Sequence, residues 1–135
     1  MTKTFILAPD SFKESMTAEQ ACQAMEKGIR QSMPDANCIH VPMADGGEGT
    51  VDALIAALGG VRVECEVTGP LSHQKIHTYF GWVERSRTAV IEMAKANGIQ
   101  LLQPHLRNPL NTSTFGTGEM IRAALNLNAE KIIIG

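Results

Sequence analysis

Two strand–loop–helix patterns follow one another in the first 60 residues, and this succession limits the possible folds more than any other feature. Residues 4–8 (TFILA) form an apolar run closed by Pro9, which predicts a buried strand. After a polar segment, residues 17–20 (TAEQ) have the form of a capping box. Apolar residues at helical spacing follow as far as Pro34, which predicts a helix ending there.

The second pattern repeats the first. Residues 38–41 predict a short strand and residues 50–58 a helix with one apolar face. Gly59 and Gly60 follow, as a left-handed helix end requires. Two such units in succession favour an α/β fold with parallel strands.

The pattern changes after residue 60. Residues 61–67 (VRVECEV) alternate apolar and charged side chains, which indicates a half-exposed strand. Residues 76–83 and 88–92 predict two more strands, separated by the turn residues ERSR. These three strands predict a small antiparallel meander, either a subdomain or an extension of the first sheet.

The last third of the chain returns to helix and strand. A short helix is predicted at residues 93–96, an irregular segment at 99–109 and a helix at about 117–127. The predicted apolar face of the longer helix is Met120, Ile121, Ala124 and Leu125. Residues 131–134 (KIII) resemble a strand inside a parallel sheet, at whose carboxyl end ligands bind in open α/β proteins. We therefore expect the chain to be the front part of a longer protein.

Composition excludes several classes of function. The 135 residues carry 12 basic and 14 acidic side chains, and only 4% of residues are aromatic. No basic stripe is present, so neither a nucleic acid nor an anionic membrane is an expected partner. The longest apolar run falls far short of a membrane span or a signal peptide. Three cysteines without C-x-x-C spacing predict free thiols in a reducing cytoplasm.

The most unusual segment is the loop that joins the second predicted strand to its helix, Asp45-Gly46-Gly47-Glu48-Gly49-Thr50. Glycines let backbone N–H groups approach a ligand, and a helix amino terminus favours an anion. Carboxylates repel a bare phosphate, so Asp45 and Glu48 indicate Mg²⁺ or a hydroxyl-bearing substrate. The alternative is a glycine turn in which Asp45 and Thr50 only cap the helix.

Two further loops combine polar groups near predicted strand or helix ends. Asp10, Ser11 and Lys13 follow the first strand, where Lys13 would neutralise a phosphate or carboxylate, unless this is an ordinary exposed loop. Residues 111–119 (NTSTFGTGE) precede the last helix and offer hydroxyls and N–H groups for a phosphate, or simply a polar helix cap. Glu92 ends an apolar strand and is a candidate buried acid.

Taken together, these loops resemble those of the bacterial glycerate kinases of glyoxylate and sugar-acid breakdown. The matching stretches occur in the family's order along the whole chain. They are APDSFKES (8–15), PMADGGEGT (42–50), VTGPL (67–71), SRTAVIEMA (86–94), RNPLNTSTFGTGEMI (107–121) and the terminal KIIIG.

The resemblance implies a fold of two α/β domains, one flavodoxin-like (Rossmann-like) and one inserted into it, with the substrate in the cleft between them. Residues 1–60 would begin the first domain and residues 61–135 the second. The implied reaction transfers the γ-phosphoryl group of ATP, with Mg²⁺, to D-glycerate and gives 2-phosphoglycerate.

The resemblance also suggests a role for each loop. Lys13 would bind the carboxylate of glycerate or a phosphate, beside Asp10 and Ser11. Asp45 or Glu48 would bind Mg²⁺ or a substrate hydroxyl at the glycine segment. Phosphate oxygens would be bound by Thr114, Gly116 and Thr117.

The chain departs from the family in its length, because family members continue beyond this last strand. We therefore expect an amino-terminal fragment that is incomplete and inactive alone. The alternatives are a non-catalytic module that binds a sugar acid or nucleotide, and a remnant that associates with another chain through residues 131–134.

Overall fold

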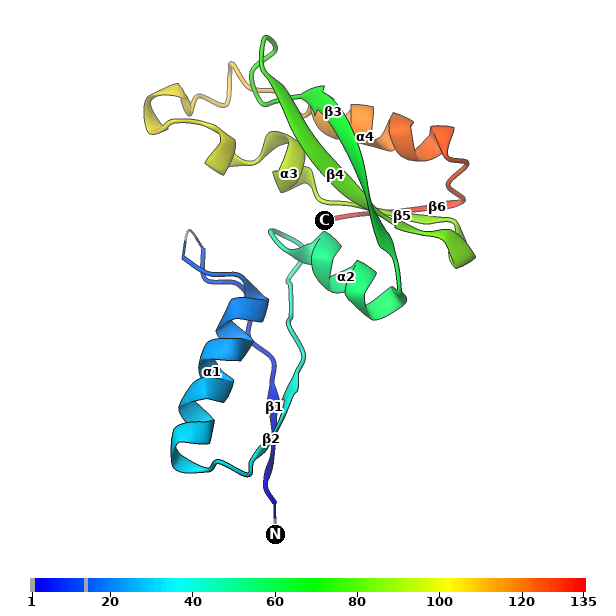
Figure 1. The fold of residues 1–135 in the computed structure, drawn as a ribbon. Helices are drawn as coiled ribbons and strands as arrows, with labels where there is room; N and C mark the ends of the chain where they lie inside the picture. The colour runs from blue at the N-terminus through cyan, green and yellow to red at the C-terminus, as the bar shows by residue number, and fades with distance from the viewer. Residues whose placement is uncertain (1, 14) are drawn as a thin grey trace. The chain divides into compact units, whose positions relative to one another are not determined.

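The computed structural model describes residues 2–13 and 15–135, so Met1 and Glu14 (the latter within the APDSFKES stretch) lie outside the described residues. The chain forms two compact units, unit 1 (Met1–Asp45) and unit 2 (Gly46–Gly135) (Figure 1). The fold is mixed α/β with parallel strands, as the sequence predicts. The assignment of residues 1–60 and 61–135 to two domains stays a prediction.

Unit 1 contains one strand–helix–strand repeat. Strands β1 (Thr4–Leu7) and β2 (Asn37–His40) pair in parallel, and helix α1 (Ala18–Ser32) connects them. The capping box is confirmed: the Thr17 side chain accepts from the Gln20 N–H, and the Gln20 side chain accepts from the Thr17 N–H. Leu7 and His40 are paired and face α1, since His40 contacts Glu26 of that helix.

The other face of the β1–β2 sheet is exposed. Ile6 and Ile39 are paired across the strands and are 69% and 45% exposed. The prediction of a buried strand at residues 4–8 therefore holds for only one of its faces. The reason is that side chains alternate between the two faces and only one face is packed against a helix.

Unit 2 is built around a four-stranded sheet of order β3-β4-β5-β6. Strands β3 (Val61–Thr68), β4 (Lys75–Val83) and β5 (Thr88–Ile91) pair in antiparallel fashion, which confirms the predicted meander. The sheet that contains this meander is separate from the β1–β2 sheet. Strand β6 (Lys131–Ile134) pairs in parallel with β5, and within the described residues it lies at the end of the sheet. Ile133 and Ile134 are accordingly exposed.

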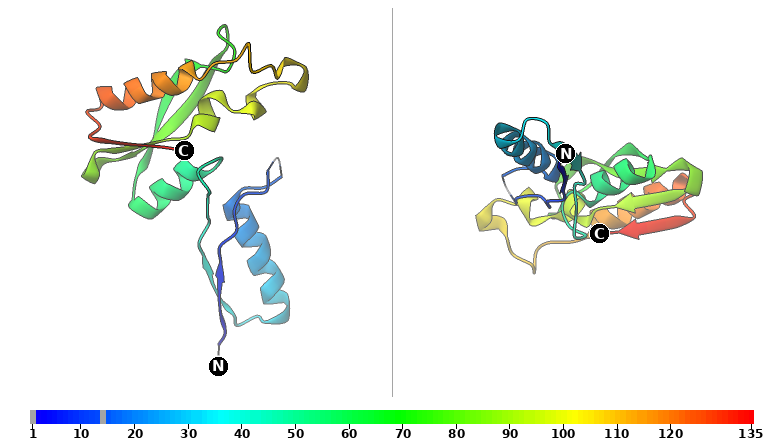
Figure 2. Two further views of the ribbon diagram at one scale, coloured as in Figure 1. Left: turned by 180° about the vertical axis from the view of Figure 1, so that it is seen from behind. Right: turned by 90° about the horizontal axis from the view of Figure 1, so that it is seen from below.

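Helices α2 (Thr50–Leu58) and α4 (Phe115–Asn126) cover opposite faces of this sheet (Figures 1 and 2). Alternate residues of β5 separate the two cores: Val90 packs with Val51 and Ile55 of α2, and Ile91 packs with Met120 of α4. Gly81 of β4 lets α2 pack closely against the sheet, because a Cβ at this position would collide with the Ile55 side chain. Leu125, predicted on the buried face of α4, is 54% exposed, because successive residues of a helix point about 100° apart and Ala124 is the one that faces the core.

Short elements complete unit 2. Helix α3 (Met93–Asn97) follows β5, and the segment predicted as irregular contains the 3₁₀ turns η2 (Ile99–Leu101) and η3 (Pro104–Leu106). A third 3₁₀ turn, η1 (Glu84–Ser86), joins β4 to β5 where the sequence predicts a turn. None of the described helices is long and apolar enough to span a membrane.

Candidate functional site

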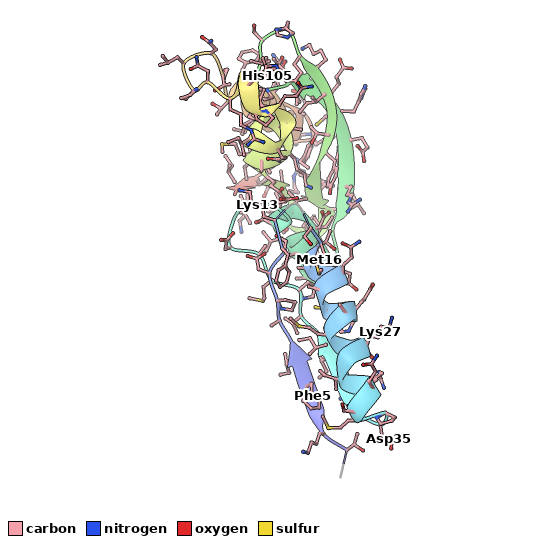
Figure 3. The ribbon with its side chains drawn as sticks, turned by 90° about the vertical axis from the view of Figure 1, so that its left-hand side faces the viewer. Phe5, Lys13, Met16, Lys27, Asp35 and His105 are labelled. Carbon is pink, nitrogen blue, oxygen red and sulfur yellow. The ribbon has the colours of Figure 1, made fainter. Side chains whose placement is uncertain are left out.

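The candidate site residues of unit 1 lie at the carboxyl ends of its two parallel strands. Beyond β1 and β2 the chain segments stay side by side, because the Val41 N–H donates to the Leu7 carbonyl at 2.8 Å and the Met43 N–H donates to the Pro9 carbonyl at 3.0 Å. Lys13 lies at this end of the unit and Asp35 at the other (Figure 3). Asp10, Lys13 and Asp45 are exposed to solvent, and Ser11 is half-buried.

The candidate residues of unit 2 lie at one edge of its sheet. Strands β3, β5 and β6 run in the same direction, so their carboxyl ends, at Thr68, Ile91 and Ile134, share this edge. The amino termini of α2 and α4 begin there as well. The structure thus brings Gly46–Thr50 and Thr114–Thr117 to the same edge of one sheet.

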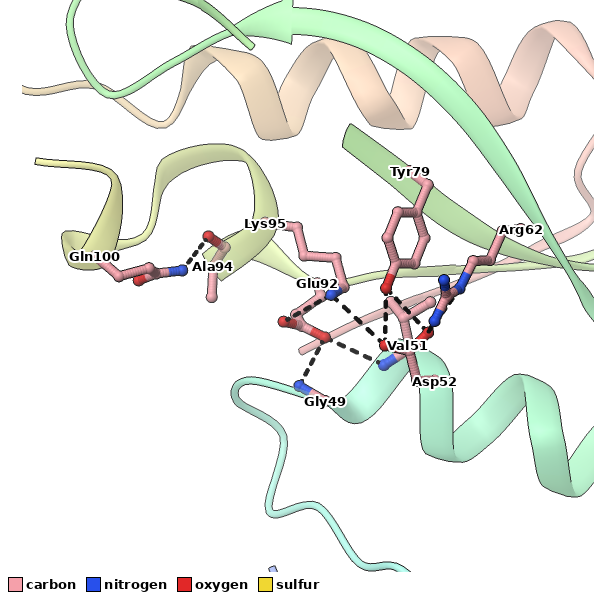
Figure 4. Close-up of polar contacts among 9 residues, drawn as sticks. All are labelled: Gly49, Val51, Asp52, Arg62, Tyr79, Glu92, Ala94, Lys95 and Gln100. Atoms are coloured by element: carbon pink, nitrogen blue, oxygen red, sulfur yellow. Dashed lines mark hydrogen bonds and ion pairs between the residues drawn. The ribbon is translucent and has the colours of Figure 1, made fainter. Parts of the chain in front are cut away.

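The glycine segment is held by a buried carboxylate. Glu92, which follows β5, is 1% exposed, and its Oε2 accepts hydrogen bonds from the N–H groups of Gly49 (3.1 Å) and Val51 (3.3 Å) (Figure 4). Gly49 is the residue before α2, with a φ of 91°, and it has no side chain with which to cap the helix. Glu92 supplies the missing acceptor, so the amino terminus of α2 already holds an anion from within the chain.

Glu92 belongs to a network of alternating charges. Lys95 Nζ lies 3.8 Å from Glu92 Oε1 and 3.7 Å from Asp52 Oδ2. Asp52 also accepts from the Tyr79 hydroxyl at 2.8 Å and from the Arg62 guanidinium at 2.7 Å. Lys95 Nζ and Arg62 Cζ each lie 4.5 Å from the centre of the Tyr79 ring, a distance at which a cation is attracted to an aromatic face.

The network shifts the protonation of its members. Burial raises the pKa of Glu92, and the nearby Lys95 charge and the two N–H donors oppose this rise only in part. Burial tends to lower the pKa of Lys95, but Tyr79 and Glu92 outweigh it and the net pKa is raised. Lys95 is therefore a firmly held cation beside a carboxylate that costs free energy to ionise.

The segment before α4 is attached to the same edge of the sheet by hydrogen bonds to Pro70 and Asn97. The Ser113 N–H donates to the Pro70 carbonyl at 2.9 Å, and the Ser113 hydroxyl accepts from the Phe115 N–H. Thr117 is buried, and its N–H and hydroxyl both donate to Asn97 Oδ1, at 2.9 and 2.8 Å. Thr114 is exposed, and a Cβ on Gly116 would collide with the Thr68 carbonyl oxygen.

Glu119 and Thr50 complete this edge. Glu119 Oε2 accepts from the Thr68 N–H at 2.6 Å, which lowers the pKa of Glu119. Thr50 is 8% exposed, and its hydroxyl oxygen is one of two buried side-chain N or O atoms without a hydrogen-bond partner among the described residues. Glu48 is exposed.

Sequence reasoning identified Glu92 but missed the residues that hold it. Lys95 follows Glu92 by three residues, the spacing of neighbours on a helix, and this spacing was the available signal. Asp52, Arg62 and Tyr79 join the network only through the packing of α2 on β3 and β4, which no local pattern reveals. Asn97 was missed for the same reason.

Fold and site together define a class: an α/β protein with glycine- and hydroxyl-rich loops at the carboxyl ends of parallel strands. Residues 5–135 match the model of the glycerate kinase family. The chain is 50% identical over 131 residues to a glycerate kinase of Haemophilus influenzae, and 49% identical over 130 residues to a glycerate 2-kinase of Escherichia coli K12. These matches include 97% and 96% of this chain, and 34% of each relative.

The fold agrees with the sequence match. The structure superposes with a TM-score of 0.74 on a crystal structure from Salmonella typhimurium LT2, of a protein assigned as glycerate kinase 2. The sequence identity is 45%, over 100% of this chain and 36% of the other. The chain therefore belongs to the glycerate kinase family, and it spans about a third of the length of the relatives it matches.

Proposed function

We propose that this chain takes part in the ATP-dependent phosphorylation of D-glycerate. The supporting observation is its membership of the glycerate kinase family over residues 5–135. The product we propose is 2-phosphoglycerate, because a relative 49% identical to this chain is named glycerate 2-kinase. Phosphoryl transfer needs mainly positioning and neutralisation of phosphate charge, which polar and glycine-rich loops at strand ends are suited to supply.

Each unit contains candidate binding groups of its own. In unit 1, Lys13 would bind the glycerate carboxylate or a phosphate, with Asp10 and Ser11 beside it. In unit 2, the glycine segment Gly46–Thr50 and the loop Thr114–Thr117 would bind phosphate oxygens or substrate hydroxyls. Because the Thr117 hydroxyl is bonded to Asn97, it would reach a phosphate only by exchanging that bond.

Mg²⁺ would be held by Asp45 and Glu48. No group of three His, Cys, Asp or Glu side chains suited to a metal occurs among the residues that the structure describes. Mg²⁺, however, commonly binds through one or two carboxylates together with substrate phosphates. Two exposed acidic residues beside a glycine segment fit an ion that arrives with ATP, and this ion would neutralise the transferred phosphoryl group.

The cytoplasm is the compartment we propose, because ATP is available there and because the three cysteines of the described chain, Cys22, Cys38 and Cys65, are free thiols.

The test is ADP release from Mg-ATP in the presence of D-glycerate. It compares the 135-residue chain with the protein expressed from the complete reading frame that encodes it. Glycerate-dependent ADP release by either supports the proposal, and NMR of the product distinguishes 2- from 3-phosphoglycerate. No ADP release by either, with no change in melting temperature on adding glycerate or Mg-ATP, would contradict it. Stabilisation by one ligand without turnover would instead favour a binding module, and ligand-independent association at high concentration an interaction remnant.

Two lysines provide a matched pair of variants for this assay. Lys13 lies in the proposed site, whereas Lys27 lies on the surface of α1 (Figure 3). Lys13→Met should weaken binding of the anionic substrate by about tenfold or more, since an ionic hydrogen bond is lost. Lys27→Met should leave the kinetic constants unchanged.

A further inference from the structure

The glycine segment Gly46–Thr50 combines glycines in unusual backbone conformations with an attachment to Glu92. Gly46 and Gly49 have φ values of 104° and 91°, and a Cβ at either position would meet nothing within 4 Å. Such a segment can take many conformations in the absence of restraint. The bonds from the Gly49 and Val51 N–H groups to Glu92 hold the point where the segment joins α2.

The attachment is fixed in turn from several elements. Glu92 continues from β5, whose neighbours Val90 and Ile91 are fully buried. Lys95 of α3 lies against both Glu92 and Asp52, and Asp52 is held by Tyr79 of β4 and Arg62 of β3. The Glu92 carboxylate therefore cannot easily turn away from α2, because the groups around it are anchored to three strands.

We propose that Glu92 is a positioning residue, which fixes the glycine segment Gly46–Thr50 so that it can bind the substrate. The inference rests on the proposed function, because that function makes the segment a binding loop. The carboxylate acts by the place of its oxygen and not by contact with substrate. A ligand anion would consequently be bound by groups of the segment other than the Gly49 and Val51 N–H groups, which Glu92 occupies.

Two conservative variants distinguish the effect of the position of the Glu92 acceptor oxygen from the effect of its negative charge. Glu92→Gln keeps an acceptor oxygen at the same reach but removes the charge. Glu92→Asp keeps the charge but withdraws the carboxylate by one methylene from the two N–H donors. If position matters, Asp is the damaging change and Gln is tolerated, whereas a role for the charge gives the opposite order. Glu130→Gln, in the exposed turn between α4 and β6 and paired with Arg87, is the matched control.

The first measurement needs no activity. Hydrogen exchange of the Gly49 and Val51 amides, followed by NMR in the 135-residue chain, should be about tenfold faster or more in Glu92→Asp. It should change less than threefold in Glu92→Gln, by the same reasoning. The Ala53 amide, bonded to the Gly49 carbonyl within α2, serves as the reference. Equal acceleration of all three amides would mean that the whole helix opens, and unchanged exchange would mean that Glu92 does not hold the segment; either result overturns the proposal.

The second measurement uses the protein that shows glycerate-dependent ADP release. Glu92→Asp should raise KM by about tenfold with a smaller effect on kcat, and Glu92→Gln should restore most of the loss. A Glu92→Gln variant as impaired as Glu92→Asp would overturn the proposal. If the wild-type protein releases no ADP, the proposed function fails, but the exchange experiment still shows whether Glu92 fixes the segment.

Discussion

The two units apply the same rule of α/β folding to very different extents. In unit 2 both faces of the sheet are covered, and Phe80, Ile91, Val51 and Met120 are entirely or almost entirely buried. In unit 1 helix α1 covers one face of a two-stranded sheet, and Ile6 on the other face is 69% exposed. A two-stranded sheet is marginal by itself. The stability of the described chain should therefore come mainly from unit 2.

The same contrast applies to the charged groups. Glu92 of unit 2 is buried beside the core, whereas Glu26 of unit 1 pairs with Arg30 and His40 at the surface of α1. Burial raises the pKa of Glu92. The hydrogen bond that Arg30 donates to Glu26 lowers the pKa of Glu26. The direction of each pKa shift thus depends on whether burial or a hydrogen-bond donor dominates around that carboxyl group.

The largest expected difference between the units concerns glycines within helices. Gly116 of α4 meets the Thr68 carbonyl oxygen, whereas Gly28 in the middle of α1 has nothing within 4 Å of an added Cβ. Gly116→Val should lower the free energy of unfolding by about 3 kcal/mol or more, because a backbone atom cannot easily give way. Gly28→Ala should raise it by about 0.5–1 kcal/mol. Urea denaturation of both variants measures this, and a tolerated Gly116→Val would remove the claim of tight packing in unit 2.

A matched pair of isoleucines sharpens the comparison of the two sheets. Ile91 is 0% exposed and Ile6 is 69% exposed, and both lie within a parallel strand pair. Ile91→Ala should cost about 2–5 kcal/mol, because it leaves a cavity in the core. Ile6→Ala should change stability by less than about 0.5 kcal/mol. Similar losses in the two variants, measured by urea denaturation, would show that the β1–β2 sheet is covered on both faces in solution.

The course of the chain could be predicted from sequence because its signals are local. The capping box at Thr17, the left-handed Gly59 and the alternating residues of β3 each occur in the structure where the pattern places them. Exposure was less predictable. The run TFILA suggests burial on both faces, but the covering of each face depends on which element packs there, and that is a property of the whole fold.

The candidate site could be predicted from sequence only as a set of loops and not as a set of contacts. Glycines and hydroxyls before helices pointed to Gly46–Thr50 and Thr114–Thr117, and the structure brings these two segments to one edge of the unit 2 sheet. Their bonds to Glu92 and Asn97 depend on residues 41 and 20 positions away along the chain. Contacts at such separation leave no trace in local spacing, so the positioning groups appear only in the structure.

The titration of Glu92 gives a smaller effect with a defined sign. Since burial raises its pKa, the folded chain holds the proton more tightly than the unfolded chain does. The stability contributed by this group is therefore full below its ordinary pKa of 4.5 and is lost as the pH rises through the raised value. Glu92→Gln should remove this loss, so its stability relative to wild type should increase with pH above 4.5. Thermal unfolding from pH 4 upward measures it, and a constant difference would contradict the raised pKa.

The smallest effect is expected for Glu26, and it has the opposite sign. The hydrogen bond from Arg30, at 2.6 Å, lowers the pKa of Glu26, so its contribution is present above the ordinary pKa of 4.5 and is lost as the pH falls through the lowered value. In Glu26→Gln the difference from wild type should therefore shrink as the solution is acidified below pH 4.5. Because the pair lies at the surface, 0.5 M salt should also reduce this difference, whereas the Glu92→Gln difference should persist. Equal sensitivity of the two differences to salt would mean that the Glu92 carboxyl group is as accessible to solvent as the surface pair of α1.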